Sequence, residues 1–483
     1  VTIEVHLSNG LPGLSIVGLP ETAVKESKDR VRGAIINSNF EFPLRRITIN
    51  MAPADLPKEG GRYDLPIAIG ILAASGQIPK NDLEQYEFAG ELALTGALRR
   101  IKGVIPFVYQ CREQQREAII PNGNKAEAAL LNGATVYAAG HLLDVCSLIT
   151  GQQKLEQVIP DQQVSEPKIK RDLADVKGQM HAKRALEIAA AGGHSLLFVG
   201  PPGTGKSMLA SRLADIMPPL SDQEAIETAA IMSVSGKQFK KGDWKQRPYR
   251  SPHHTASAVA LVGGGSNPRP GEISLSHNGV MFLDELPEFD RKVLEVLREP
   301  LETGQITISR ATSQAEFPAR FQLVAAMNPC PCGYLGDKDG RCTCSPMQVQ
   351  RYRAKISGPL MDRIDMHVEV PRIAHEELRG AATGESSEQI RKRVQQARAI
   401  QTKRGYNQNS ILESKDIDRF CALDAGDEKL LEKAVEKLGL SARAMHRILK
   451  VARTIADLEG SEPIQRNHLT EAISYRRMDR EAS

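Results

Sequence analysis

Three runs of apolar residues mark the middle of the chain, at 196–199, 280–283 and 321–327. Each run is continuous rather than alternating, which is typical of parallel strands that are buried on both faces of a sheet. Asp284 and Glu285 directly follow the second run. Open α/β sheets bind their ligands at the carboxyl ends of the strands. The pattern therefore predicts an α/β core, over residues 171–371, with a parallel sheet and a ligand site at its strand ends.

Outside this core the pattern changes. Residues 1–160 alternate short strands with helices and contain many Gly and Pro turns, which predicts a separate α/β domain. Residues 161–170 are mostly Gln, Ser, Glu, Pro and Lys, a composition typical of a linker. Residues 372–483 place apolar side chains at i, i+3 and i+4, and this spacing predicts a helical bundle.

The octapeptide GPPGTGKS at 200–207 follows the first apolar run and precedes a helix-like segment. It satisfies the pattern G-x-x-x-x-G-K-[ST], in which glycines let backbone N–H groups point at phosphate oxygens and the lysine neutralises the β and γ charge. We therefore expect ATP or GTP to bind at these residues: Gly200, Pro201, Pro202, Gly203, Thr204, Gly205, Lys206, Ser207 and Met208.

The acidic pair after the second run predicts hydrolysis as well as binding. Asp284 is the expected partner of Mg²⁺ together with the hydroxyl of Ser207, and Glu285 is expected to polarise the attacking water. Asn328 directly follows the third run, and the family resemblance described below implies that its amide holds the same water. A helix N-cap with an acid in its first turn is the alternative for the acidic pair.

Composition limits the class of protein. The chain has 483 residues with 41% hydrophobic residues, and no apolar run reaches the length of a membrane span. No signal peptide is visible, so we expect a cytoplasmic protein without a membrane partner, whose natural start lies upstream of Val1. The net charge of +4 is small, so any contact with nucleic acid depends on local patches.

The cysteines divide into two groups. Cys111, Cys146 and Cys421 are isolated and fit buried small hydrophobic positions. The other four lie on one short glycine-rich loop, and four thiolates suit tetrahedral Zn²⁺. A reduced metal-free loop and a redox pair are the alternatives. The candidate zinc ligands are Cys330, Cys332, Cys342 and Cys344.

The order of these parts resembles that of an AAA+ ATPase. The segments LREPLETGQITISR, FPARFQLVAAMNPCPCG and SGPLMDRID resemble its magnesium-chelatase-like branch, and the whole chain is similar to the ComM/YifB competence-associated family. The resemblance implies that residues 372–483 form a helical lid. It also implies that Arg363 is an arginine finger directed at the γ-phosphate of a neighbouring subunit and that Arg443 senses nucleotide. A finger acting in trans implies a ring, with six subunits expected; surface salt bridges are the alternative for both arginines.

Residues 1–160 also resemble the proteolytic domain of Lon. PKEG at 57–60 and GELALTG at 90–96 are similar to the segments that carry its serine and lysine. Aligning those segments puts Arg62 at the serine position and Ile105 at the lysine position. Without a nucleophile or its base, we expect a domain without proteolytic activity.

Two segments suggest contact with DNA. Residues 237–250 combine six Lys and Arg residues with Phe239, Trp244 and Tyr249. The cations can attract phosphates, and bases can stack on the aromatic rings. Residues 306–317 predict a β-hairpin, which in the family protrudes into the central channel. A solvated basic loop and a purely structural hairpin are the alternatives. The candidate DNA contacts are Lys240, Lys241, Lys245 and Arg310.

These features together favour a ring ATPase that moves on single-stranded and branched DNA. The resemblance implies helicase or branch-migration activity on recombination intermediates during DNA uptake. A chelatase motor subunit acting on a partner other than DNA is the main alternative. An ATP-dependent protease is disfavoured by the missing catalytic pair, and a non-enzymatic scaffold by the intact Lys206, Asp284 and Glu285.

Overall fold

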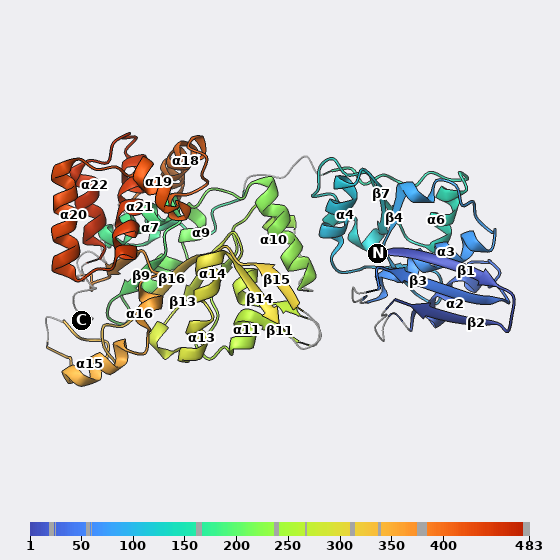
Figure 1. The fold of residues 1–483 in the computed structure, drawn as a ribbon, viewed down its shortest axis with the longest axis horizontal. Helices are drawn as coiled ribbons and strands as arrows, with labels where there is room; N and C mark the ends of the chain where they lie inside the picture. The colour runs from blue at the N-terminus through green and yellow to red at the C-terminus, as the bar shows by residue number, and fades with distance from the viewer. Residues whose placement is uncertain are drawn as a thin grey trace. The chain divides into compact units, whose positions relative to one another are not determined.

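The computed structural model of the protein describes residues 1–18, 24, 26–54, 58, 60–160, 167–235, 241–265, 268–309, 314–336, 340–373 and 384–476. It divides into two compact units (Figure 1). The first consists of Val1–Ser165 and Ala225–Trp244, and the second of Glu166–Glu224 and Lys245–Ser483. The segment Ala225–Trp244 thus packs with the N-terminal unit, although the sequence pattern assigned it to the 171–371 core.

The N-terminal unit is an α/β domain with two small three-stranded sheets. Strand β3 lies between β1, which is antiparallel to it, and β2, which is parallel. The second sheet is parallel, in the order β4-β7-β8. The elements are β1 (Thr2–Ser8), β2 (Gly13–Val17), α2 (Ser27–Asn37), β3 (Arg46–Ala52), α3 (Asp64–Ala74), β4 (Tyr86–Phe88), β5 (Glu91–Leu92), β6 (Leu98–Arg99), α4 (Val104–Glu113), β7 (Glu117–Pro121), α5 (Lys125–Ala128), β8 (Val136–Ala139) and α6 (Leu142–Ile149).

The core of this unit explains its local sequence. Every second residue of β3 is buried, namely Ile47, Ile49 and Met51, as expected for a strand with one covered face. Helix α3 is apolar around most of its circumference and buries eight of its residues. A helix with this composition belongs in the interior of a domain.

The second unit contains a five-stranded parallel sheet in the order β10-β13-β16-β9-β17. Every residue of β9, β13 and β16 is buried, which confirms the prediction of parallel strands covered on both faces. Their carboxyl ends meet at one edge, since Leu283 pairs with Ala325 and Met327 with Val199. The strands are β9 (Leu196–Val199), β10 (Tyr249–Arg250), β13 (Val280–Leu283), β16 (Gln322–Met327) and β17 (Met366–Glu369).

Helices and two small antiparallel ribbons complete the sheet-containing part. The predicted hairpin is present as β14 paired with β15. The further elements are α7 (Met180–Gly192), α8 (Lys206–Ala210), α9 (Leu213–Ile216), α11 (Ala258–Val262), β11 (Gly263–Gly264), β12 (Arg269–Pro270), α12 (Glu272–Leu275), α13 (Arg291–Glu295), α14 (Arg298–Thr303), β14 (Gln305–Ser309), β15 (Gln314–Pro318), α15 (Pro346–Arg353) and α16 (Gly358–Met361). Helix α10 (Asp222–Val234) belongs to the N-terminal unit from Ala225 onward.

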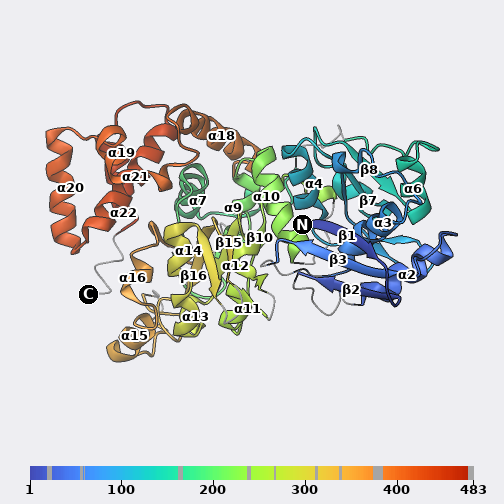
Figure 2. The same ribbon diagram turned by 45° about the vertical axis from the view of Figure 1, so that its right-hand side comes forward.

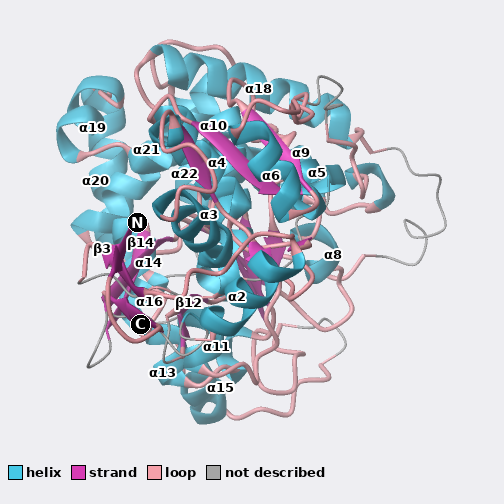
Figure 3. Ribbon diagram, turned by 90° about the vertical axis from the view of Figure 1, so that its right-hand side faces the viewer, coloured by secondary structure: helices cyan, strands magenta, loops and turns pink. Residues whose placement is uncertain are grey.

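The C-terminal part of this unit is helical, and Figure 3 shows α19, α20, α21 and α22 gathered together. Side-chain caps set the helix starts: Ser441 accepts from the Ala444 N–H at 3.2 Å and begins α21. Gly439 ends α20 with a φ of 64°. The bundle helices are α18 (Ser387–Lys403), α19 (Ser414–Phe420), α20 (Ala425–Leu438), α21 (Ala442–Leu458) and α22 (Arg466–Ser474).

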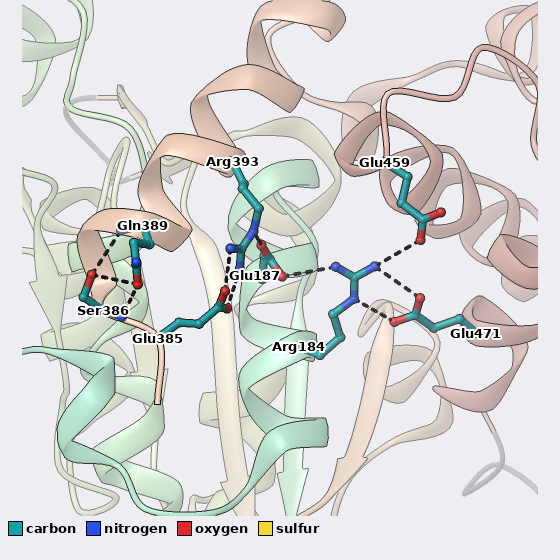
Figure 4. Close-up of polar contacts among 8 residues, drawn as sticks. All are labelled: Arg184, Glu187, Glu385, Ser386, Gln389, Arg393, Glu459 and Glu471. Atoms are coloured by element: carbon teal, nitrogen blue, oxygen red, sulfur yellow. Dashed lines mark hydrogen bonds and ion pairs between the residues drawn. The ribbon is translucent and has the colours of Figure 1, made fainter. Parts of the chain in front are cut away.

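The helical bundle and the sheet share one hydrophobic core, which includes Phe198 of β9 and Ile455 of α21. Helix α7 lies between the bundle and the strands (Figure 2). Polar contacts reinforce this packing (Figure 4). Arg184 of α7 donates to Glu471 of α22 at 3.0 Å, and Arg393 of α18 donates to Glu187 of α7 at 2.5 Å. The bundle is therefore joined to the sheet through both apolar and ionic contacts.

Within the described ranges, no helix combines the length and apolar character needed to cross a bilayer.

Candidate nucleotide-binding site

The loop after β9 has the backbone shape of a phosphate cradle. Gly203 has a φ of 76° and Gly205 a φ of 88°, both in the left-handed region that favours glycine. The hydroxyl of Thr204 donates to the Pro201 carbonyl at 3.0 Å and braces the turn. Helix α8 begins at Lys206, directly after the curl. Backbone N–H groups in a loop of this kind are available to phosphate oxygens.

Lys206 is folded back over this loop. Its ammonium donates to the carbonyl oxygens of Gly200 at 2.7 Å and Pro201 at 2.8 Å. It also donates to Oδ1 of Asn328, at the end of β16, at 3.2 Å. Burial lowers the pKa of Lys206 from its ordinary value, and the nearby carboxylate of Asp284 opposes that shift. A phosphate would supply the negative charge that these three neutral acceptors lack.

Ser207 and Asp284 meet across the mouth of the loop. The Ser207 hydroxyl donates to Oδ2 of Asp284 at 2.5 Å, which joins the start of α8 to the end of β13. A hydroxyl and a carboxylate are the hard oxygen ligands that Mg²⁺ takes beside a nucleotide. The pair therefore fits a magnesium site, with Ser207 and Asp284 as its protein ligands.

Glu285 follows Asp284 in a left-handed backbone conformation, with a φ of 53°. Its N–H donates to Oδ1 of Asp284 at 2.9 Å. Its carboxylate contacts His254, with 3.1 Å between Oε2 and Nδ1. The sequence pattern assigned no role to His254. His254 comes shortly after β10, and parallel strands place their carboxyl ends at one edge of the sheet, so its position in the sequence was a signal that it lies near the acidic pair. The signal was weak because β10 is only two residues long and is hard to recognise in the sequence.

These groups line one cavity of about 380 Å³. It contains residues of the glycine-rich loop, the acidic pair and the amide at the end of β16, so the structure brings together residues that are up to 126 positions apart in the chain. The lining residues are Pro202, Gly203, Thr204, Gly205, Lys206, Ser207, Met208, Asp284, Glu285, Met327 and Asn328.

Arg363 does not line this cavity. Its side chain is 7% exposed and forms an ion pair with Glu302 of α14. Nη1 donates to the Pro359 carbonyl at 2.7 Å, whereas the buried Nε has no hydrogen-bond partner. The guanidinium is thus held by its own chain, beside α14 and α16.

Arg443, at the start of α21, lies near the same carboxylate and is exposed. A hydrogen bond from Arg363 lowers the pKa of Glu302, and the charges of Arg443 and Arg298 lower it further. Three arginines therefore surround one carboxylate. We call Arg298, Glu302, Arg363 and Arg443 the arginine cluster.

The four loop cysteines converge as the zinc prediction requires. Their sulfur atoms all lie within 4.8 Å of one another. The Sγ of Cys330 is 3.4 Å from that of Cys332 and 3.8 Å from that of Cys342. Sulfurs about 2.3 Å from a tetrahedral zinc have a comparable spacing. Backbone hydrogen bonds from Tyr334 and Thr343 lower the pKa of Cys332 to about 6, whereas the neighbouring cysteines raise the pKa of Cys342 and Cys344.

The cysteine loop also touches the phosphate loop. Gly333 has a φ of 85°, and a Cβ added there would lie 2.7 Å from Cδ of Pro202. Tyr334 is flanked by the guanidinium groups of Arg341 and Arg372, at 5.4 and 5.3 Å from its ring centre. The cysteine loop therefore supports the nucleotide cavity from behind Asn328.

The basic segment at 237–250 differs from its prediction. Trp244 is only 5% exposed, so the expected stacking of a base on this ring is wrong. Arg247 donates to the carbonyls of Pro218 and Asn278, and Arg250 donates to Glu272 at 2.6 Å. Much of the charge in this segment is used inside the protein.

The four proposed DNA contacts are less well defined. Lys240, the side chain of Lys241 and Arg310 lie outside the described residues. Lys245 forms an ion pair with Asp222, with 2.7 Å between Nζ and Oδ1. The hairpin that leads to Arg310 is present, with Ser309 paired to Gln314.

The two residues of the N-terminal unit that align with the catalytic serine and lysine of Lon cannot act as a nucleophile and its base. Ile105 is fully buried. The guanidinium of Arg62 lies beside Gly103, 3.4 Å from where a Cβ would be. Neither side chain is a nucleophile or a general base.

Three family descriptions match consecutive parts of the chain. "Subunit ChlI of Mg-chelatase" matches residues 3–124, "Magnesium chelatase, subunit ChlI" matches residues 172–378, and "Magnesium chelatase, subunit ChlI C-terminal" matches residues 384–476. The matches therefore include the glycine-rich loop, the acidic pair and the arginine cluster.

Curated relatives resemble the chain over nearly its whole length. Competence protein ComM of Haemophilus influenzae is 55% identical over 99% of this chain and 95% of its own. The protein YifB of Escherichia coli is 53% identical over 99% of this chain and 94% of its own. The magnesium-chelatase 38 kDa subunit of Rhodobacter capsulatus is 24% identical over 62% of this chain and 86% of its own. Given this full-length similarity, the chain belongs to the ComM/YifB family of magnesium-chelatase-like AAA+ proteins.

Proposed function

We propose that the protein is an ATP-driven motor that moves on single-stranded and branched DNA. The observation that carries this proposal is the nucleotide cavity, in which Lys206, Ser207 and Asp284 converge with Glu285. Lys206 binds the β- and γ-phosphates, and Ser207 and Asp284 hold Mg²⁺, which neutralises charge on the phosphates. Glu285 polarises the attacking water, and Asn328 helps to hold it.

The active form is an assembly in which one subunit completes the site of the next. Support comes from Arg363, which lies outside its own cavity and faces Glu302 instead. On assembly, the guanidinium exchanges this carboxylate for the γ-phosphate of the neighbouring subunit. Arg443 shares the arginine cluster and would respond to the same phosphate. A ring of six is the proposed assembly.

The proposed substrate is DNA in recombination intermediates, on which the motor catalyses unwinding and branch migration during natural transformation. The 55% identical relative that is named a competence protein supports this assignment. The β14–β15 hairpin is the proposed DNA contact, together with Arg310, which follows β14 in the sequence. The 237–250 segment is a weaker candidate, because Lys245, Arg247 and Arg250 have partners within the chain.

The cysteine loop is proposed to hold a structural zinc ion. The convergence of four sulfurs supports it, and the contact between Gly333 and Pro202 indicates what the ion would stabilise. Metal analysis of the full chain purified without chelator should find about one zinc per chain. A Cys332→Ser/Cys342→Ser variant should lose it. Wild-type protein with no bound zinc would contradict the proposal.

The decisive experiment measures the ATPase rate of the full chain alone, with single-stranded DNA and with a branched junction. A DNA motor should be stimulated, more by its preferred substrate than by the other. Glu285→Gln should bind ATP and lose turnover in every condition. An ATPase that is unaffected by either DNA would contradict the motor assignment.

A chelatase-type motor subunit acting on another partner is the second candidate. The similarity to the 38 kDa chelatase subunit favours it, although that similarity covers only 62% of this chain. The same assay separates the two functions, because a chelatase-type subunit should hydrolyse ATP at the same rate with and without DNA.

A further inference from the structure

His254 follows strand β10 and contacts Glu285, a residue that lines the nucleotide cavity. Strand β10 runs parallel to β13, and Arg250 pairs with Met281. The segments that follow these two strands therefore leave the sheet at the same edge. His254 therefore arrives beside Glu285, and its Nδ1 lies 3.1 Å from Oε2 of that carboxylate.

The two partners differ in how firmly they are held. Glu285 is 54% exposed, and a glutamate side chain of this exposure samples several rotamers unless a contact selects one. The His254 ring is 32% exposed and packs against two other rings. Its centre is 4.1 Å from that of His253 and 6.4 Å from that of the buried Phe289, which it meets at 81°. The histidine is thus the anchored member of the pair.

We propose that His254 is the positioning residue of the catalytic carboxylate. With its proton on Nδ1, the imidazole donates to Oε2 of Glu285 and fixes the direction of the carboxylate. The other oxygen, Oε1, is then free to accept a hydrogen bond from the attacking water. This assignment rests on the proposed ATPase function, because it concerns the residue that polarises water in that reaction.

The rate of hydrolysis depends closely on where the Glu285 carboxylate lies relative to the attacking water. The water oxygen bonds to the γ-phosphorus as the bond to the bridging oxygen breaks, and ADP leaves with that electron pair. Glu285 accepts the proton that the water loses. Misplacing a reacting group by about 1 Å costs on the order of 10²-fold in rate. An unanchored Glu285 should therefore lower turnover by a factor of this order.

The pair holds Glu285 at the cavity rather than away from it. Glu285 lines the cavity in the same structure in which it contacts His254. A restraining contact would instead withdraw the carboxylate from the cavity, and its loss would raise turnover. The sign of the effect therefore separates positioning from restraint.

His254 should affect turnover without affecting nucleotide binding. It lines no part of the cavity, which is formed around the phosphates by the glycine-rich loop and by Lys206. Removing its ring should leave the affinity for ATP within about twofold of the original, because no hydrogen bond to the phosphates is lost. A contact that only supported the fold would lower affinity and turnover together.

The experiment compares steady-state kcat and KM of ATP hydrolysis, and ATP affinity, for the wild-type full chain and three variants. His254→Ala should lower kcat on the order of 10²-fold with KM nearly unchanged. His254→Asn should recover much of the loss, because the asparagine N–H occupies nearly the place of Nδ1–H. His253→Ala is a graded control: it removes one of the two rings that pack against His254 but leaves the contact between Nδ1 and Oε2 of Glu285, so it should lower kcat less than His254→Ala does.

A double variant tests the coupling directly. In a Glu285→Gln background, His254→Ala should cause almost no further loss, since both changes act through one carboxylate. An unchanged or increased kcat in His254→Ala, or a full additional loss in the double variant, would overturn the inference. If the wild-type chain does not hydrolyse ATP at all, the proposed function itself fails and the inference fails with it. Normal wild-type turnover with an unaffected His254→Ala variant refutes the inference alone.

Discussion

The nucleotide cavity and the arginine cluster lie in the same unit but hold their charged groups in different ways. In the cavity, Lys206 is bound only by neutral oxygens of Gly200, Pro201 and Asn328. In the cluster, Arg363 is already paired with a carboxylate, that of Glu302. To bind a phosphate, Lys206 needs only to turn toward it, whereas Arg363 must first leave the carboxylate of Glu302.

This difference suggests a division of labour between two faces of one subunit. The cavity contains the groups for nucleotide binding and is available in a single chain. In the proposed assembly, the arginine cluster would supply its cations to a phosphate bound by the neighbouring subunit. Binding should therefore require one chain, and fast hydrolysis two.

The strongest test of the comparison removes the cavity lysine. Lys206→Ala should lower ATP affinity by about 10²-fold, because hydrogen bonds to charged groups contribute about 1.5–3 kcal/mol each, and should eliminate turnover. Equilibrium titration with a fluorescent ATP analogue measures the affinity. Lys245→Ala is the control, since that lysine pairs with Asp222 outside the cavity. Equal affinity of Lys206→Ala and wild type would refute the cavity assignment.

Removing the cluster arginine should separate hydrolysis from binding. Arg363→Ala should retain ATP affinity and lose about 10³-fold in turnover, the scale of arginine fingers in other nucleotide hydrolases. Mixing Arg363→Ala with Lys206→Ala chains should restore part of the ATPase activity, because some interfaces then combine an intact cavity with an intact arginine. No recovery in mixtures that still assemble would contradict the shared site.

The cluster also has a structural anchor that can be tested by pH. Asp365 is buried; burial opposes its ionisation, but Arg447 and His194 hold its pKa below the usual range. Because Arg447 also donates to the Arg363 carbonyl at 3.2 Å, this carboxylate helps to fix the arginine segment. Asp365→Asn should cost about 3 kcal/mol of unfolding free energy at pH 7, since it removes the buried, charged partner of the partly exposed Arg447.

The pH dependence of that cost has a defined sign. A carboxylate with a lowered folded pKa stabilises the protein above its unfolded pKa of about 3.9, and this contribution is lost as the pH falls through the folded value. Denaturant titrations should therefore show a wild-type advantage that is constant near neutrality and shrinks below about pH 4. Asp362→Asn, a half-exposed change in the same segment, is the control. A pH-independent difference would contradict the argument.

The smallest effect on ATP binding is expected from a change in the cysteine loop, where it contacts the phosphate loop. Gly333→Ala adds a Cβ 2.7 Å from Pro202 and should displace the phosphate loop, weakening ATP binding by about tenfold for a cost of 1–2 kcal/mol. Gly336→Ala is a matched control, because Gly336 also has a positive φ, of 79°, but no atom of the described residues lies within 4 Å of the added Cβ. Equal affinities in the two variants would show that the cysteine loop does not support the cavity.

The strands of the nucleotide core could be predicted because each carries its own signal. The runs at 196–199 and 280–283 are observed with those bounds as β9 and β13, and the run at 321–327 begins one residue later as β16. A strand buried on both faces must be continuously apolar, whatever its neighbours are. The glycine-rich loop is likewise local, because its φ angles require glycine at fixed positions.

Charge in the 237–250 segment could not be interpreted in the same way. Lys and Arg are equally compatible with solvent, nucleic acid and internal ion pairs, and the choice depends on partners distant in sequence. Glu272 is 22 residues from Arg250, and Asn278 is 31 residues from Arg247. The same applies to His254, whose partner Glu285 is reached only through the pairing of β10 with β13.

The chain by itself determined the parallel sheet, the phosphate loop, the acidic pair, the cysteine loop and the helical C-terminal part, because each depends on spacing or composition within a short segment. The tertiary structure decided which cations remain available: it left Lys206 facing a cavity, paired Arg363 with Glu302 and bonded Arg247 to the carbonyls of Pro218 and Asn278. The physical reason is that local sequence sets backbone shape and burial pattern, whereas a charged side chain takes whichever partner the fold brings within reach.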